Sequence, residues 1–549
     1  MGLKLPLRYS VLCAIILLTV IHVIFRFITS PTHLRRLTII HTNDIHAHIE
    51  QFNQYGKDCD SLDIELGSCV GGIARQKTII DRIRQNSPNT LLFDAGDQFS
   101  GTAYYGYYKG NISHQVMNLL GYDLMTLGNH EFDDGVEQLS HFLSKLNFPT
   151  VCANLEIKEQ PELSKRIKPY EIFPEYQLGV IGIVTTTTEF TSNSGPNVKF
   201  TQPIDMVKKY VQELKSVGVK TIIVLSHNGY REDIELATQT TDIDLIVGGH
   251  SHTFLSSNSE DPHHSHAEGD YPTLIKNLDG HPTYITQAWS WGRYVGHLEL
   301  QLNDEGKIHE INGRPIRIDS SVPEDPEVAI AIQGWRDPLV EYMNRVIGKA
   351  ILPFSPPTYW VTVESTIGNL VGDAISHVRN TSVGIFFNFG DVQGGLEIGD
   401  IQIQDIFRVI PFDSSVVEIT LSGRQLFDMI EGVLSHKNLE NQEKVTGAIQ
   451  VNGIRFRYLP NATEFHKLQE LFISNGNLSE YNAVQFDQQY TLVTLDFVAK
   501  GGDNILYPPI PHTTPLGTLR SILIQYIEAQ KTLIPHLDGR ITISTDSIE

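Results

Sequence analysis

The strongest constraint on the fold is a repeated alternation of short apolar runs with amphipathic helices between residue 37 and about residue 302. The apolar runs have the length of buried strands and cover residues 37–40, 91–93, 178–184, 222–225 and 245–247. One helix is predicted from an apolar face formed by Ile204, Val207, Tyr210, Val211 and Leu214. This pattern predicts an α/β fold with a mostly parallel sheet, helices covering it, and ligands bound beyond the carboxyl ends of the strands.

Polar side chains follow these apolar runs where a ligand is expected. The candidates that share this placement are Asp44, His46, Asp97, Asn129, His227, His250 and His252. A single Asp-x-His or His-x-His would indicate a structural or surface histidine, but recurrence after five strands favours metal binding. Oxygen and nitrogen ligands without cysteine favour Zn, Mn or a similar divalent ion. This many ligands predicts two ions, the arrangement that clamps the attacking and leaving oxygens in phosphoryl hydrolysis.

The segment from Leu127 to Asp133 adds a candidate catalytic group. Asn129 can bind a hard cation through its amide oxygen, and His130, the next residue, would lie beside the ion. Asp133 is placed to orient the His130 imidazole. Taken alone, this segment would equally indicate a turn after a strand.

Length and charge limit the remaining possibilities. With 549 residues, 41% hydrophobic and 19% charged, the chain is long enough for two domains with separate cores. The formal net charge is −22 and the main body contains no basic stripe. Because proteins that bind phosphate backbones cluster Lys and Arg, we expect no nucleic-acid partner.

The N-terminus indicates export. Lys4 and Arg8 precede an apolar run from residue 11 to about 27, which predicts either a secretory signal peptide or an uncleaved signal anchor. The C-terminus lacks an apolar tail, so we expect no lipid anchor, a secreted or cell-surface body, and membrane attachment only through the N-terminal segment.

The cysteines and glycosylation motifs agree with export. Cys59 and Cys69 flank a short polar loop and predict a local disulfide, while Cys152 is expected to be a buried free thiol. The Asn-x-Ser/Thr acceptors are Asn111, Asn380, Asn461 and Asn477.

The polar blocks also carry a family resemblance. Residues 41–46, 96–98, 128–131 and 248–252 resemble the motifs of calcineurin-like metallophosphoesterases. With segments after residue 360, the chain resembles the family of ecto-5′-nucleotidases and bacterial UDP-sugar hydrolases. The resemblance implies an N-terminal α/β/β/α domain at 37–325, a linker helix at 326–347, and a C-terminal α/β substrate domain at 348–549, after a leader at 1–36. A homodimer is also possible.

The resemblance implies roles for the candidate ligands. One metal would be held by Asp44, His46, Asp97 and His252, and the other by Asp97, Asn129, His227 and His250, with Asp97 bridging. A water acidified by both metals would attack phosphorus. His130 would stabilise the phosphoryl oxygens or the leaving group, and Asp133 would hold its tautomer.

The second domain implies a nucleotide substrate. Phe412 and Phe497 match the phenylalanines that sandwich a nucleobase, Asp503 matches the carboxylate that bonds the ribose, and Asn388 is retained. However, Gln393 and Val361 stand where relatives have phosphate-binding arginines, and Asp391 adds a negative charge nearby.

Three interpretations follow from this departure. In the first, the chain hydrolyses AMP-like nucleotides and Lys500 supplies the missing cation. In the second, the chain hydrolyses a different phosphate ester, such as the nucleoside di- and triphosphates used by apyrase-like relatives. In the third, the chain is a secreted protein that binds nucleotides or nucleosides. Two other features are interpreted as structural: Arg75 as the start of a helix, and His263-His264-Ser265-His266 as a solvated insertion.

Overall fold

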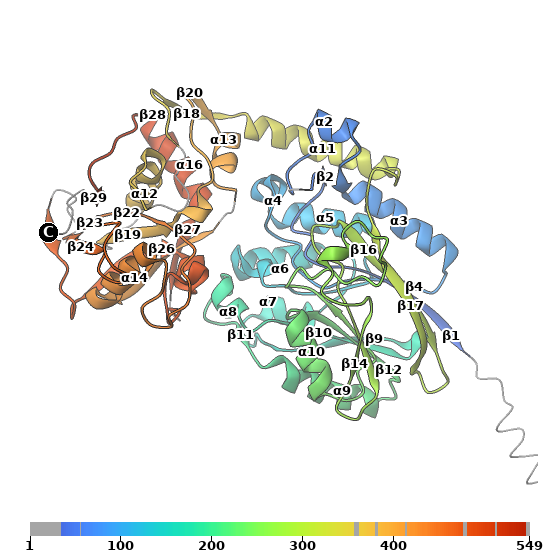
Figure 1. The fold of residues 1–549 in the computed structure, drawn as a ribbon. Coiled ribbons are helices and arrows are strands. Elements are labelled where there is room, and N and C mark those ends of the chain that lie inside the picture. Colours follow the sequence, from blue (N-terminus) through green and yellow to red (C-terminus); the bar gives the residue numbers. More distant parts are fainter. Residues whose placement is uncertain are drawn as a thin grey trace, which may run out of the picture.

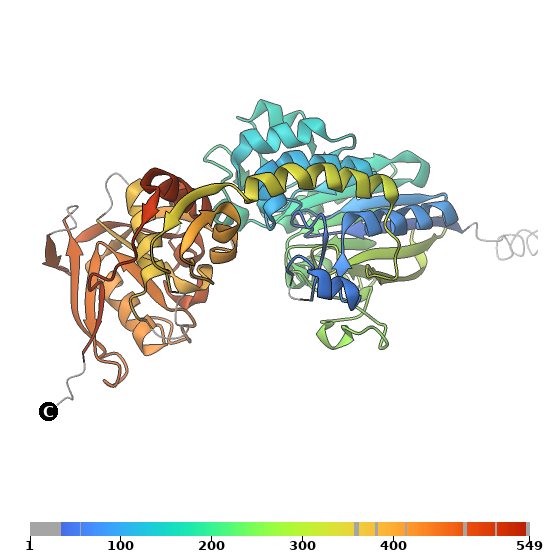
Figure 2. The same ribbon diagram turned by 90° about the horizontal axis from the view of Figure 1, so that it is seen from above.

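A computed structural model describes residues 34–54, 56–355, 362–378, 383–411, 414–475, 480–510 and 513–544. Two lobes are joined by the long helix α11 (Pro326–Met343), which lies along the first lobe and leads into the second (Figure 1 and Figure 2). Five features named from the sequence lie outside the described residues: Val361, Asn380, Phe412, Asn477 and nearly all of the N-terminal leader.

The first lobe contains two large sheets. The seven-stranded sheet has the order β17 (Ile308–Arg317), β16 (Tyr294–Leu302), β1 (Arg35–Thr42), β4 (Thr90–Asp94), β5 (Leu124–Thr126), β6 (Thr150–Val151) and β8 (Ile167–Lys168). The six-stranded sheet has the order β14 (Thr273–Lys276), β15 (Pro282–Thr286), β13 (Leu245–Gly248), β12 (Thr221–His227), β10 (Leu178–Val184) and β9 (Tyr170–Phe173). The central neighbours β1, β4 and β5 are parallel, as are β10, β12 and β13.

These sheets form the inner two layers of a helix–sheet–sheet–helix arrangement. Successive residues of a strand face opposite sides, so Ile40 of β1 packs against helices while Leu37 and Ile39 pack against the second sheet. The helices on the first side are α3 (Ile73–Asn86), α5 (Gly110–Leu120), α6 (Gly135–Lys145) and α11. Helices α9 (Pro203–Ser216) and α10 (Tyr230–Gln239) pack on the second sheet. The implied four-layer fold is confirmed.

The predicted elements of this lobe are largely confirmed. The run at 178–184 is strand β10, and the other four runs extend by one to a few residues. In α9, the predicted apolar face buries Val207, Val211 and Leu214. The linker helix, implied at 326–347, is α11; it begins at Pro326 because Asp325 caps it by accepting hydrogen bonds from the amides of Glu327 and Val328, and it ends at Met343.

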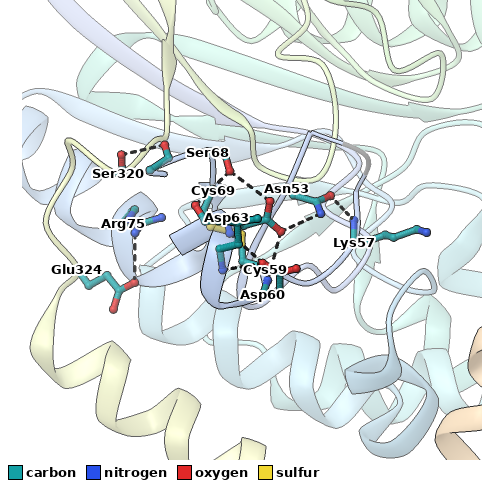
Figure 3. Close-up of a disulfide and its surroundings, with 12 residues drawn as sticks. Asn53, Lys57, Cys59, Asp60, Asp63, Ser68, Cys69, Arg75, Ser320 and Glu324 are labelled. Atoms are coloured by element: carbon teal, nitrogen blue, oxygen red, sulfur yellow. Dashed lines mark hydrogen bonds and ion pairs between the residues drawn. A yellow bond between two sulfur atoms is a disulfide. The ribbon is translucent and has the colours of Figure 1, made fainter. Parts of the chain in front are cut away.

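The disulfide between Cys59 and Cys69 is present, as predicted (Figure 3). It closes the loop that carries the short helix α2 (Ser61–Glu65), which is capped by Asp60. Cys152 is buried and free, which confirms the prediction. Asn111 and Asn461 are exposed, but their glycosylation stays a prediction. Within the described ranges, no helix combines the length and apolarity needed to cross a bilayer.

The second lobe has its own core. Its five-stranded sheet has the order β22 (Ile449–Asn452), β19 (Gly384–Asn388), β26 (Gln489–Leu495), β21 (Ser415–Ser422) and β27 (Thr514–Thr518). A four-stranded sheet contains β25 (Tyr481–Ala483), β24 (Leu468–Ser474), β23 (Ile454–Tyr458) and β29 (Ile541–Ile543). The main helices are α12 (Thr366–Val378), α13 (Ile403–Val409), α14 (Gly423–Ser435) and α16 (Leu519–Gln530).

The two lobes meet around α11. The Tyr108 hydroxyl of the first lobe donates a hydrogen bond to the Trp335 carbonyl, 2.9 Å away, and Arg336 pairs with Glu50. Just beyond the helix, Arg345 pairs with Glu528 of α16 at 3.0 Å. The helix is therefore fixed to the first lobe, and the chain enters the second lobe directly after it.

Candidate metal centre

The seven predicted ligands converge at the carboxyl ends of strands from both sheets of the first lobe. They are Asp44 and His46 after β1, Asp97 after β4, Asn129 after β5, His227 at the end of β12, and His250 and His252 after β13. Ligand atoms of Asp44, His46 and His252 form one compact group, and those of Asp97, His227 and His250 form another, each within 4.8 Å.

Asp97 lies between these two groups. Its Oδ2 is 3.0 Å from His227 Nε2 and 3.8 Å from His46 Nε2. On one side, Asp44 Oδ1 lies 3.3 Å from His252 Nε2. On the other, Asn129 Oδ1 lies 2.9 Å from His250 Nδ1 and 3.2 Å from His227 Nε2. One carboxylate oxygen thus lies closest to a histidine of each group.

The histidine tautomers suit metal binding. His46 Nδ1–H donates to the Phe99 carbonyl at 3.0 Å, and His227 Nδ1–H donates to the Ala95 carbonyl at 2.7 Å. Because a carbonyl only accepts, each Nδ1 must carry a proton, so Nε2, which lies on the side of Asp97, is the ring nitrogen left to bind a metal ion. The backbone therefore orients these rings as ligands.

The charges also fit divalent cations. Asp44 is fully buried and Asp97 is 2% exposed, so leaving both ionised without a counter-charge would be costly. In the described part of the chain, their ion-pair partners are histidines, with no Lys or Arg among them. Two divalent cations with nitrogen and oxygen ligands would balance the carboxylates and use the facing lone pairs.

The ligand loops have an unusual backbone. Five of the seven candidate ligands have positive φ angles: Asp44, His46, Asp97, His250 and His252, with values from 49° to 73°. This region costs a non-glycine residue roughly 1–2 kcal/mol, so the surrounding structure must impose it. The glycines show how tightly the loops pack: a Cβ on Gly128 would lie 2.1 Å from Asp97 Oδ1.

Glu131 is a buried residue whose role the sequence did not reveal. Its carboxylate accepts hydrogen bonds from the amides of Asp97, Gln98, Phe99 and Gly128, at 2.6–3.2 Å. Burial and the nearby Asp97 charge raise the pKa of Glu131, while the amide donors favour the ionised form. Glu131 thereby ties the Asp97 loop to the Asn129 loop. The sequence signal that could have found it is its place at the end of the motif block 128–131.

The structure brings His130 and Asp133 together. His130 Nδ1 lies 2.6 Å from Asp133 Oδ2, and Asp133 also accepts from the hydroxyls of Ser100 and Ser192 at 2.5 and 2.6 Å. Burial opposes protonation, but the charges of Asp133 and Asp97 outweigh it and raise the pKa of His130 to about 10. His130 also lies near the metal ligands, with a ring nitrogen within 4.8 Å of ligand atoms of His46 and Asp97.

The second-lobe candidates form a separate cluster. Asn388 donates to Asp503 Oδ2, and Asp503 Oδ1 accepts from the Thr446 hydroxyl at 2.9 Å. Phe497 is 43% exposed, which leaves its ring accessible. Among the described residues, no hydrogen bond or ion pair joins this cluster to the seven candidate ligands of the first lobe.

The candidate phosphate-binding residues of the second lobe are less well suited to binding a phosphate than the nucleoside candidates are to binding a nucleoside. Lys500 Nζ lies 2.8 Å from Asp496 Oδ2, so its charge is balanced within the second lobe. Gln393 is exposed and carries no charge. Asp391, expected near the substrate phosphate, is buried and accepts from the Ser414 hydroxyl at 2.5 Å, while burial raises its pKa to about 6. Val361 and Phe412 lie outside the described residues.

Comparison with known proteins agrees with this arrangement. Residues 37–254 match the family model of the calcineurin-like phosphoesterases, and residues 346–509 match that of the 5′-nucleotidase C-terminal domain. The 5′-nucleotidase of Bos taurus is 32% identical over 535 residues, covering 93% of this chain and 91% of the relative. The chain belongs to the 5′-nucleotidase family. It is a metal-dependent phosphoester hydrolase.

Other relatives extend the similarity to both lobes. Snake venom 5′-nucleotidase from Naja atra is 31% identical, over 93% of this chain and 99% of the relative. The crystal structure of a 5′-nucleotidase precursor from Thermus thermophilus has a TM-score of 0.63 at 31% identity, and covers 93% of this chain and 100% of that one.

We expect Glu131→Gln to weaken metal binding by roughly 10- to 100-fold, the usual effect of losing a group that supports ligands. A neutral amide has one acceptor oxygen, so it cannot serve all four backbone amides of the two loops. Metal content after dialysis against a metal buffer measures the effect. Glu137→Gln, an exposed change on α6, is the matched control. Equal metal affinity in the wild type and Glu131→Gln would show that Glu131 does not support the site.

Proposed function

We propose that this protein hydrolyses nucleoside 5′-phosphates, such as AMP, to nucleoside and phosphate with the help of two divalent cations. The observation that carries the proposal is the pair of adjacent ligand groups with the Asp97 carboxylate between them, in a chain related to 5′-nucleotidases along most of its length. We further propose that residues 37–325 form the metal domain, 326–347 the linker and 348–549 the substrate domain.

The residues present fit two metal sites. Asp44, His46, Asp97 and His252 would hold one ion, and Asp97, Asn129, His227 and His250 the other. The mixed oxygen and nitrogen set suits Zn, with Mn as another candidate. When bound, two such ions supply an activated water and neutralise charge on the phosphoryl group.

His130 has the proton needed on the leaving-group side. Asp133 accepts from Nδ1–H, which leaves Nε2–H of the imidazolium free to donate to a phosphoryl oxygen or to the departing 5′ oxygen. The Ser100 and Ser192 hydroxyls hold the Asp133 carboxylate in place. The ring therefore needs little reorientation when the substrate arrives.

The second lobe offers groups for the nucleoside. The exposed Phe497 ring can stack on a base, with Phe412 as its proposed partner. Asp503, held by Asn388 and Thr446, can accept hydrogen bonds from ribose hydroxyls. Because stacking accepts any base, these residues support a nucleoside without selecting one.

The candidate phosphate-binding residues favour a second function. The substrate would be a nucleoside di- or triphosphate, as for an apyrase, or another phosphate ester. Gln393 has no charge, and Lys500 is already paired with Asp496. A site that lacks the arginines of relatives would bind a monophosphate less tightly, so a substrate with other contacts could be preferred. Failure to turn over any ester would favour the nucleotide-binding interpretation.

Export to the cell surface or the medium is also proposed. The Cys59–Cys69 disulfide is typical of an oxidising compartment, and similar proteins occur in snake venoms.

The first test compares phosphate release from AMP, ADP, ATP, UDP-glucose and an aryl phosphate, with Zn or Mn supplied. We expect AMP turnover in the wild type and its loss in Asp97→Asn, because that change removes the shared carboxylate. His130→Gln should lower kcat roughly 10²- to 10⁴-fold while metal content stays unchanged. Turnover of the aryl phosphate alone, with AMP untouched, would contradict the nucleotidase assignment.

A second test concerns Lys500. If Lys500 leaves Asp496 to bind the substrate phosphate, Lys500→Gln should raise the KM for AMP roughly tenfold or more, because a charge-assisted hydrogen bond is lost. Asp496→Asn frees the ammonium and should not raise KM. Lys531→Gln, an exposed change in the same lobe, is the control. Unchanged kinetics in Lys500→Gln would remove Lys500 from the phosphate site.

A further inference from the structure

A cavity lies in the first lobe, away from the candidate metal centre. It has a volume of about 200 Å³ and is lined by Gln54, Ser68, Val70, His263, Arg293 and Arg317. None of these residues is a candidate metal ligand or a proposed nucleotide contact. The lining comes from residues 54–70, which include the disulfide loop, from the His263–His266 insertion, from Arg293 just before β16 and from Arg317 at the end of β17.

Arg293 is the most unusual member of this lining. It is only 8% exposed, and within the described residues it forms no ion pair with a carboxylate. Among the described residues its Nε has no hydrogen-bond partner, and its one side-chain hydrogen bond runs from Nη2 to the Gln54 carbonyl at 3.3 Å. A buried guanidinium without a counter-charge is costly, so the site is suited to an anion.

Aromatic rings hold the Arg293 side chain. Its guanidinium carbon lies 5.0–5.2 Å from the ring centroids of Phe52, Trp289 and Trp291. Such rings stabilise a cation but offer no hydrogen-bond acceptors in the guanidinium plane. The rings therefore fix the orientation of Arg293 and leave its unused N–H groups available.

Two further cationic or ionisable groups face the same cavity. Arg317, at the end of β17, also has an Nε without a partner, and its Nη1 lies 3.8 Å from Asp319. His263 bonds the Tyr294 hydroxyl at 2.9 Å and lies 4.0 Å from Asp261. Burial lowers the pKa of His263, and the charges of Arg317 and Arg293 lower it further. Two guanidinium groups thus line this cavity in a chain with a net charge of −22, while Asp319 and Asp261 lie beside Arg317 and His263.

Backbone hydrogen bonds hold the segments that line this cavity in place. The Ile318 amide donates to the Arg293 carbonyl at 2.8 Å, and Val70 forms a bridge with Asp319. Ser68 precedes Cys69 of the disulfide, and its hydroxyl donates to Asp63 (Figure 3). The arginines are therefore presented by a built site rather than by a loose surface loop.

We propose that Arg293, Arg317 and His263 bind a tetrahedral oxyanion, namely a phosphate or sulfate group that is free in solution or carried by a glycan. The planar guanidinium fork matches two oxygens of such a group, and two arginines from different elements could bind different oxygens. The cavity is several times the volume of one water molecule, about 30 Å³, so it has room for the anion and accompanying waters. The His263–His266 insertion, interpreted from sequence as solvated, then has a binding role through His263.

The test is a calorimetric titration of the full, zinc-loaded protein with sulfate at constant ionic strength. Sulfate is chosen because it is not a product of the proposed reaction. We expect saturable binding that weakens roughly tenfold or more in Arg317→Gln and in Arg293→Gln, because each change removes charge-assisted hydrogen bonds. Arg314→Gln, an exposed change on the same strand β17, should bind like the wild type.

One further variant and a check of folding keep the result unambiguous. Asp97→Asn separates this cavity from the metal centre and should retain sulfate binding, even if the proposed hydrolase activity is lost. Because Arg317 is partly exposed, its variant should remain folded even if Arg293→Gln does not, which circular dichroism checks. No saturable binding, or equal binding in the wild type and Arg317→Gln, would overturn the proposal.

A sulfated disaccharide then distinguishes the two sources of the anion. Tighter binding than free sulfate, lost in Arg317→Gln, would support a glycan-borne group. Equal or weaker binding of the disaccharide would support a free ion.

Discussion

The structure of the metal centre depends on one buried carboxylate that serves two groups of ligands. Asp97 directs a single oxygen toward both His46 and His227, and it is 2% exposed. A charge in this position is stable only if cations or donors surround it. The loops at the ends of five strands supply those groups. Strand order, loop conformation and side-chain tautomers together place them around the Asp97 carboxylate.

Holding this arrangement has a conformational cost. Asp44, Asp97 and His250 adopt left-handed backbone angles that side chains usually avoid. Glu131 offsets this cost by collecting backbone amides from both neighbouring loops, and Gly128 allows the Asp97 carboxylate to approach its backbone. Part of the backbone strain in this protein therefore lies at the candidate metal site, where a preorganised arrangement is needed.

Periodicity and motif placement predicted much of this molecule. The apolar runs became strands, Cys59 and Cys69 pair, and the seven polar residues after the strands meet in space. Tertiary contacts were harder to predict. Alternation of strands and helices indicates parallel pairing, but it does not show that β10, β12 and β13 belong to a second sheet. The bonds from Glu131 to the Asp97 loop and the lining of the Arg293 cavity depend on contacts between segments distant in the sequence. The pair of Lys500 with Asp496 is local, four residues apart, but the sequence pattern did not indicate it.

The most direct test of the account is anomalous diffraction from crystals grown with Zn or Mn. The account predicts two ions per chain, about 3.5–4 Å apart, on either side of the Asp97 carboxylate. One group should include His46 and His252, and the other His227 and His250. A single ion, or ions that do not contact Asp97, would contradict the shared-carboxylate centre on which the proposed hydrolysis rests.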